Sequence, residues 1–159
     1  MATFTRIIFK KNENDLINSF KKFLLKDVKN KTKKNKRYTF VLTGGNSPIN
    51  LYKELAKIKN MPWEKIDFFI GDERYVEETS PYSNINLCRE FLLNKLKISK
   101  KQIFYITTKL NSVLNDSIKY EKKIKTYFKK KNISFDLILL GLGNDGHIAS
   151  LFKQNIKNW

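Results

Sequence analysis

The stretch of this sequence with the clearest chemical potential covers residues 135–152, FDLILLGLGNDGHIASLF. Its apolar residues 137–140 are few enough to form a buried strand of a parallel sheet, and a glycine-rich turn follows at residues 141–146. His147, the only histidine of the chain, comes next, where we expect a helix to begin. Such a strand–turn–helix unit presents backbone N–H groups and a polar side chain at the carboxyl edge of the sheet, where open α/β sheets bind ligands.

A helix N-terminus disfavours the charged form of an imidazole, so this position predicts a neutral His147 that can accept a proton. A general base of this kind typically contributes about 10²–10⁴ in rate. The alternative is a structural or merely exposed histidine, and the position of His147 in a glycine-rich loop favours the catalytic interpretation.

Arg74 follows Asp72 and Glu73 directly after another predicted strand. Its guanidinium could bind an anion through two hydrogen bonds or stabilise an oxyanion during a reaction. The alternative is a cluster of surface ion pairs.

Gly44 and Gly45 also follow a predicted strand, and a helix is expected after Ser47. Glycines let the backbone approach a phosphate, and the positive end of the helix would point at it. A tight strand-to-helix turn with no ligand is the equal alternative. The segment is not a Walker P-loop, because no Gly-Lys-Ser/Thr follows.

Gly141, Gly143 and Gly146 satisfy the spacing G-x-G-x-x-G, which could indicate a dinucleotide site. The dinucleotide fingerprint also needs an acidic residue about 20 positions later. The sequence ends at Trp159, before that position, so we disfavour dinucleotide binding.

Strand and helix patterns alternate along the whole chain. This predicts a single α/β domain over residues 1–159, with a mostly parallel, Rossmann-like sheet and right-handed crossovers. All carboxyl ends of parallel strands meet at one edge, so loops 43–47, 71–74 and 141–147 are expected to converge on one cleft. We expect strands at residues 5–9, 38–42, 66–70, 102–106 and 135–140.

Helices are expected between these strands. Ser47 and Ser83 are predicted N-caps, with Pro48 as the first helical residue after Ser47. The apolar stripes that indicate the helices are Ile17, Phe20, Leu24 and Val28; Ile49, Tyr52, Leu55 and Ala56; Ile85, Cys88, Leu92 and Leu96; and Val113, Tyr120, Ile124 and Tyr127.

Composition narrows the class of protein. A hydrophobic content of 41% predicts a folded globular chain, and no apolar run reaches the length of a membrane span. The net charge of +17 would suit nucleic-acid binding, but only four of the 32 basic residues are arginines and the lysine-rich run 29–37 lacks interleaved aromatics. We expect no nucleic-acid and no membrane partner.

The single Cys88 excludes an intramolecular disulfide and lies on the apolar side of its predicted helix, so we expect it in the core. The chain start lacks a secretory apolar segment, and a cytoplasmic location is expected. No Cys/His cluster indicates a metal site.

Four segments together make the sequence recognisable: TGGNSP, FFIGDERYV, SNINLCREFLL and LILLGLGNDGHIASLF. In this order and spacing they resemble the 6-phosphogluconolactonase family. The related glucosamine-6-phosphate deaminases typically carry Asp-Glu-Tyr where this chain has Asp72, Glu73 and Arg74. They also carry a Phe-Asn-Glu type run near Ser150, and both differences favour the lactonase.

The resemblance implies a three-layer α/β/α sandwich and hydrolysis of 6-phospho-D-glucono-1,5-lactone to 6-phosphogluconate in the pentose phosphate pathway, with no metal and no organic cofactor. It implies that His147 activates water, that Arg74 stabilises negative charge or holds substrate, and that Asp72 and Glu73 orient groups around it. Asp145 would shape the turn that presents His147. The implied substrate-binding residues are Gly44, Gly45, Asn46, Ser47 and Gly143.

Family members continue beyond the SLF element, whereas this sequence ends seven residues after Phe152, and Asn46 stands where the family commonly has Ser. The C-terminal part of the family fold is therefore expected to be missing, which leaves one flank of the sheet uncovered unless an oligomer covers it. Two alternatives stay open: a glucosamine-6-phosphate deaminase-like enzyme, and an inactive truncated remnant that binds anions.

Overall fold

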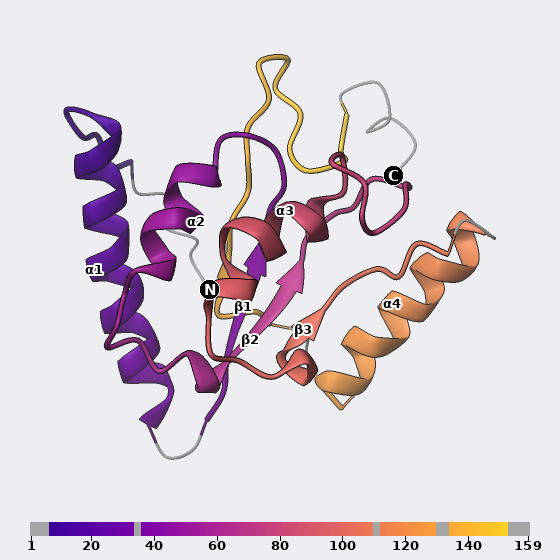
Figure 1. Ribbon diagram of the computed structural model, residues 1–159, viewed down its shortest axis with the longest axis horizontal. Coiled ribbons are helices and arrows are strands. Elements are labelled where there is room, and N and C mark those ends of the chain that lie inside the picture. The colour runs from indigo at the N-terminus through magenta and orange to yellow at the C-terminus, as the bar shows by residue number, and fades with distance from the viewer. Residues whose placement is uncertain (1–6, 34–35, 110–111, 130–133, 153–159) are drawn as a thin grey trace.

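The computed structural model describes residues 7–33, 36–109, 112–129 and 134–152, and its centre is a four-stranded parallel sheet in the order β3-β2-β1-β4 (Figure 1). The strands are β1 (Tyr38–Leu42), β2 (Ile66–Ile70), β3 (Ile103–Phe104) and β4 (Leu137–Ile138). The order of strands changes direction between β1 and β4, and this switch point is where open α/β sheets form their ligand crevice.

Four α-helices connect and cover these strands in the described part of the chain: α1 (Glu13–Lys31), α2 (Ile49–Ala56), α3 (Asn84–Phe91) and α4 (Val113–Tyr127). Short 3₁₀ turns lie at Trp63–Lys65, Leu93–Lys95 and Lys100–Gln102. The predicted N-cap Ser83 is confirmed, because its hydroxyl accepts a hydrogen bond from the Asn86 N–H at 3.3 Å. None of the described helices combines the length and the hydropathy that a bilayer crossing requires.

The two faces of the sheet are covered by different helices. Successive side chains of a strand point to opposite faces. Phe40 and Phe68 pack in the core beneath α1, α2 and α3, whereas Phe69 packs edge-on against Tyr127 of α4, with ring centroids 5.2 Å apart. The layers are therefore helix, sheet and helix, as the family resemblance implied, with α4 on the second face.

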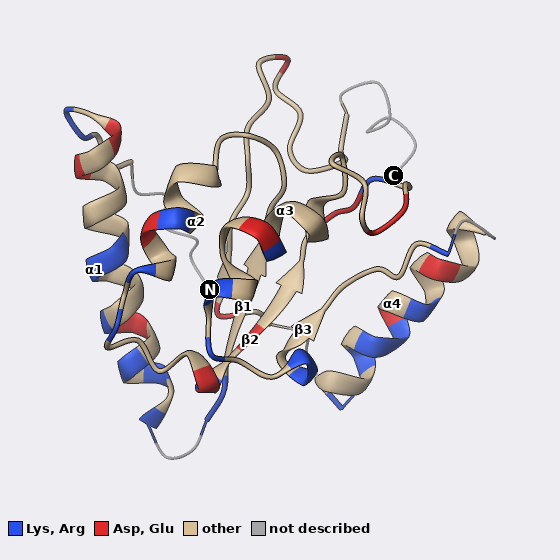
Figure 2. Ribbon diagram, viewed as in Figure 1, with Lys and Arg blue, Asp and Glu red and all other residues tan. Residues whose placement is uncertain are grey.

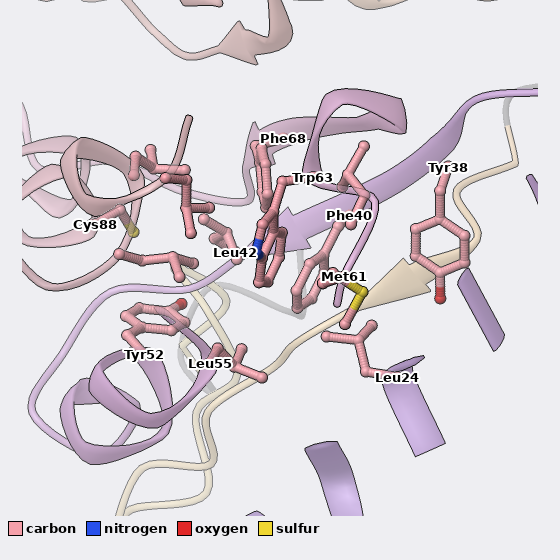
Figure 3. Packing of buried hydrophobic residues seen from close by; sticks show 14 of the residues in the cluster. Leu24, Tyr38, Phe40, Leu42, Tyr52, Leu55, Met61, Trp63, Phe68 and Cys88 are labelled. Atoms are coloured by element: carbon pink, nitrogen blue, oxygen red, sulfur yellow. The ribbon is translucent and has the colours of Figure 1, made fainter. Parts of the chain in front are cut away.

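The main core consists of large apolar side chains that are almost completely buried (Figure 3). Members of the three predicted stripes supply its helical side, namely Leu24 and Val28 from α1, Tyr52 and Leu55 from α2, and Ile85 and Cys88 from α3. Cys88 lies in this core, as predicted. The residues labelled in Figure 3 are Leu24, Tyr38, Phe40, Leu42, Tyr52, Leu55, Met61, Trp63, Phe68 and Cys88.

One carboxylate anchors β4 to the sheet. Oδ2 of Asp136 accepts hydrogen bonds from the Thr39 N–H and hydroxyl, both at 2.9 Å, and the Asp136 N–H donates to the same hydroxyl at 2.8 Å. The Leu139 N–H then donates to the Val41 carbonyl at 3.0 Å. These bonds set the register that brings the loop after β4 beside the loop after β1.

Several predicted strands are shorter than expected. Residues 7–9 form no strand and are exposed, and the first two residues of the predicted strand 5–9 lie outside the described residues. Gln102 is not in β3, because its side chain closes a capping box with Ser99 and donates to two carbonyls of the neighbouring turn. β4 covers only Leu137–Ile138 of the predicted run 135–140.

The start of α2 also differs from the prediction. Pro48, and not Ser47, is the N-cap of α2, and no side chain caps this helix. The Ile49 N–H instead donates to the Asn46 carbonyl at 3.2 Å, so a backbone turn provides the partner that a serine hydroxyl was expected to provide.

The end of α3 differs as well. This helix ends at Phe91, so Leu92 and Leu96 pack in the core from the following 3₁₀ turn.

Candidate active site

The three loops that follow β1, β2 and β4 meet at the carboxyl edge of the sheet and enclose a cleft of about 150 Å³. The convergence expected from the parallel topology is therefore present. Its lining residues are Thr43, Gly44, Gly45, Ser47, Asp72, Arg74, Asn84, Gly141, Leu142, Gly143, His147 and Ala149.

The loop after β1 is held rigidly at its base. The Tyr52 hydroxyl accepts a hydrogen bond from the Thr43 N–H at 3.0 Å and donates one to the Thr43 carbonyl at 2.7 Å. Gly45 has a φ of +83°, which a residue with a side chain rarely adopts. Gly44, Gly45 and Ser47 line the cleft, whereas Asn46 is exposed and is not among the lining residues.

Glu73 turns away from the cleft and binds the start of α3. Its carboxylate accepts the N–H groups of Asn84 at 2.6 Å and Ile85 at 2.9 Å, and the Ser83 hydroxyl at 3.3 Å. A carboxylate at a helix N-terminus satisfies unpaired donors and complements the helix dipole. Glu73 therefore holds the loop after β2 to the start of α3, and its role in orienting groups around the substrate stays a prediction.

Asp72 and Arg74 of the same loop line the cleft. The side chain of Arg74 is exposed, and no carboxylate of a described residue lies within ion-pair distance of its guanidinium. The described residues therefore do not form the surface ion-pair cluster around Arg74 that was the alternative interpretation. Asp72 accepts a hydrogen bond from the Ser150 hydroxyl at 2.8 Å, which ties the loop after β2 to the loop after β4.

His147 does not begin a helix, and this sequence-based expectation is wrong for the described residues up to Phe152. Ile148 instead forms isolated bridges with Leu142 and Leu151. Ala149 has a φ of 51°, which is incompatible with a right-handed helix at this point. The argument for a neutral His147 from the dipole of a following helix therefore no longer applies.

A tight turn presents the imidazole instead. The Gly143 N–H donates to the His147 carbonyl at 2.8 Å, and the imidazole packs against the Phe152 ring with centroids 4.8 Å apart and planes tilted by 30°. Nδ1 of His147 contacts the Asp145 carboxylate, and this hydrogen bond lowers the pKa of Asp145. With Nδ1 engaged by a carboxylate, Nε2 is the nitrogen free to take a proton, which is the arrangement of an oriented general base.

Gly143 is needed for this arrangement. A Cβ at Gly143 would lie only 2.2 Å from Cε1 and Nδ1 of His147. The glycine thus provides the space in which the imidazole lies, and its predicted contact with substrate stays a prediction.

Two residues of the site were missed in the sequence. Asn84 is buried, lines the cleft, and donates from its amide to the Asp72 carbonyl at 2.8 Å. The available signal in the sequence was that Asn84 directly follows the predicted N-cap Ser83. Its position opposite the glycine loop became visible only in the structure. Ser150 gave no signal, because its contact with Asp72 depends on the turn at Ala149.

The chemistry of the cleft follows from these parts. It combines a histidine whose Nε2 has no hydrogen-bond partner and a guanidinium that has no carboxylate partner, both counted within the described ranges, with a glycine-rich loop. Such a set can bind an anion, activate a water molecule and stabilise negative charge on an oxygen. The described residues contain no group of three or more His, Cys, Asp or Glu side chains arranged to hold a metal ion.

The sequence matches the family model described as glucosamine-6-phosphate isomerases/6-phosphogluconolactonase over residues 11–158. It is 44% identical over 119 residues to the 6-phosphogluconolactonase of Synechocystis, which covers 73% of this chain and 49% of the relative. It is 39% identical over 118 residues to the 6-phosphogluconolactonase of Thermotoga maritima, with 74% and 51% covered. The chain thus spans about half the length of these curated relatives.

Solved structures of 6-phosphogluconolactonases have the same fold as this chain. The Thermotoga maritima 6-phosphogluconolactonase superposes with a TM-score of 0.78 at 31% identity, over 90% of this chain and 63% of that one. The Trypanosoma cruzi 6-phosphogluconolactonase superposes with a TM-score of 0.84 at 27% identity, over 97% and 64%. A monomeric glucosamine-6-phosphate deaminase, at 17% identity and a TM-score of 0.75, shares the fold alone. The chain belongs to the 6-phosphogluconolactonase family, within the larger group of glucosamine-6-phosphate isomerases and 6-phosphogluconolactonases.

Proposed function

We propose that this chain hydrolyses 6-phospho-D-glucono-1,5-lactone to 6-phosphogluconate. The observation that carries the proposal is the meeting of His147, Arg74 and the glycine loop in one cleft. The lactonase names of the relatives support the same reaction, although the chain spans only about half of their length.

The phosphate of the substrate would lie against the loop of Gly44, Gly45 and Ser47. Backbone N–H groups next to glycines can approach phosphate oxygens closely, and α2 begins directly after this loop. Asn46 stays a predicted phosphate contact, which would require its exposed side chain to turn toward the ligand.

The carbonyl of the lactone would then lie near His147 and Arg74. Nε2 of His147 takes a proton from water, and the resulting hydroxide attacks C1 to give a tetrahedral intermediate. Arg74 stabilises the negative charge on the former carbonyl oxygen. Asp145 keeps Nδ1 of His147 engaged, so that the imidazolium formed in this step is oriented and stabilised.

The intermediate collapses by breaking the bond between C1 and the ring oxygen. The ring oxygen takes the proton from Nε2 of His147 and becomes the C5 hydroxyl group. The new carboxylic acid then ionises, so that each turnover releases one proton to the solution.

The test is hydrolysis of freshly generated lactone by the purified chain, measured as proton release above the spontaneous rate. The variant His147→Ala should lower the rate by about 10²–10⁴. Asn144→Ala provides the matched control, because Asn144 is an exposed neighbour in the same turn and does not line the cleft. Thermal melts establish that both variants fold.

Three results would oppose the proposal. A folded His147→Ala variant with an unchanged rate removes His147 as the base. Release of ammonia from glucosamine-6-phosphate would favour the deaminase-like alternative. A cooperatively folded chain that binds 6-phosphogluconate without hydrolysing the lactone would be the anion-binding remnant.

A further inference from the structure

A second cavity, of about 730 Å³, lies between α4 and the segment 104–109 that leaves β3. None of the residues that line it lines the candidate active site. Its volume falls within the range of about 300–1,000 Å³ that small-molecule sites usually have. The lining residues are Phe104, Thr107, Lys109, Asp116, Lys119, Tyr120, Lys122, Lys123, Thr126 and Tyr127.

The floor of this cavity is aromatic. Phe104 and Tyr127 meet edge to face with ring centroids 5.2 Å apart. The hydroxyl groups of the two tyrosines are engaged elsewhere: Tyr120 donates to the Ile70 carbonyl at 2.8 Å, and Tyr127 donates to the Asp67 carboxylate at 2.7 Å. The rings therefore offer mainly carbon surface to the cavity, which suits a flat apolar ring.

The rim of the cavity is basic, and Figure 2 shows several lysine segments on α4. The rim carries four lysines and one carboxylate, a formal net charge of +3. The carboxylate of Asp116 is already engaged by the Tyr75 hydroxyl at 3.1 Å, the Lys109 N–H at 3.2 Å and Lys119 Nζ at 3.3 Å.

Three of the four lysines of the rim, Lys109, Lys122 and Lys123, are without a carboxylate partner among the described residues, whereas Lys119 pairs with Asp116. Nζ of Lys123 lies 3.4 Å from the Thr107 hydroxyl, and so reaches from α4 toward the opposite wall. Lys125, one turn further on, pairs with Glu121 and does not line the cavity. The free positive charge is thus concentrated at the cavity and not spread evenly along the helix.

We propose that this cavity binds a mononucleotide, with the base on the aromatic floor and the phosphate among the lysines of the rim. An aromatic floor and a basic rim match the two halves of this ligand, since bases stack on aromatic side chains and phosphates pair with ammonium groups. A sugar phosphate lacks the flat ring, and an uncharged ring would leave the lysines without a partner. The proposal is independent of the lactonase activity.

The experiment uses the full chain and titrates AMP by calorimetry, with adenosine and inorganic phosphate as the two half-ligands. AMP should bind at least about tenfold more tightly than either half-ligand, because only AMP uses both the floor and the rim. The variant Lys122→Glu/Lys123→Glu should weaken AMP binding by more than about tenfold, since it removes two charge-assisted contacts and adds repulsion. Lys125→Glu is the matched control and should change binding by less than about twofold.

Backbone NMR shifts during the AMP titration give a second readout that requires no variant. The shifts should fall on α4 and residues 104–109. The proposal is overturned if AMP does not bind at millimolar concentration, if Lys125→Glu weakens binding as much as the double variant, or if adenosine binds as tightly as AMP. Shifts confined to residues 43–47, or displacement of AMP by 6-phosphogluconate, would equally overturn it, because the nucleotide would then occupy the candidate active site.

Discussion

The side chain of Asn84 occupies the space in which a Cβ of Gly44 would lie: an ideal Cβ there would be 1.8 Å from Asn84 Oδ1 and 2.1 Å from its Cγ. The glycine loop after β1 and the start of α3 are therefore fitted to one another at the edge of the cleft. Glu73 fixes α3 from the other side through two backbone N–H groups.

Gly44→Ala is expected to displace Asn84 and destabilise the chain by about 1–3 kcal/mol, the usual cost of overpacking. It should also weaken binding of 6-phosphogluconate, because the loop moves with Asn84. Gly141→Ala is the matched control, since a Cβ added at this cleft glycine meets no atom of a described residue within 4 Å. Adding Asn84→Ala to Gly44→Ala should recover part of the lost stability. Equal melting temperatures for Gly44→Ala and Gly141→Ala would contradict the contact.

Tyr52→Phe is expected to lower the free energy of unfolding by about 1–3 kcal/mol, because it leaves the N–H and carbonyl of Thr43 without their shared partner. Urea unfolding measures the effect. The control is Tyr82→Phe, because Tyr82 is 75% exposed. This variant should change the free energy of unfolding by no more than about 0.5 kcal/mol. If the two variants unfold at the same urea concentration, the Tyr52 hydroxyl does not hold the loop.

Glu73→Ala is expected to lower the free energy of unfolding by about 1–3 kcal/mol, because three donors at the start of α3 lose their acceptor. Amide hydrogen exchange should accelerate at Asn84 and Ile85 more than in α1. The exposed Glu77 gives a control of the same charge in Glu77→Ala. Unchanged exchange at the start of α3 would argue against the capping role.

Cys88 is expected to resist thiol reagents at pH 8 in the folded chain and to react fully in urea. Burial raises the pKa of this thiol to about 12, so that almost no thiolate exists near neutral pH. A raised pKa in the folded chain means that the protonated Cys88 thiol stabilises the folded state. Its contribution to the free energy of unfolding is complete below about pH 9 and is lost as the pH rises toward 12. Rapid native labelling, measured by absorbance of the released thiolate, would show that the core opens around α3.

Much of the fold could be predicted from the chain because it depends on local pattern. The helical stripes predicted α1, α2, α3 and α4. The β-branched and aromatic runs predicted β1 and β2 with the bounds that the structure has. The edge strands were overestimated, because their length depends on neighbouring contacts, such as the use of the Gln102 side chain in a capping box.

The sequence by itself determined which residue types stand at the ends of the strands, and parallel topology was enough to place three loops at one edge. Only the tertiary structure decided how they face each other. It turned Glu73 toward α3, brought Asn84 against Gly44, and replaced the expected helix at His147 with a turn in which Asp145 engages the imidazole. The physical reason is that periodicity encodes burial and secondary structure, whereas side-chain direction in a loop depends on hydrogen bonds between residues distant in the chain.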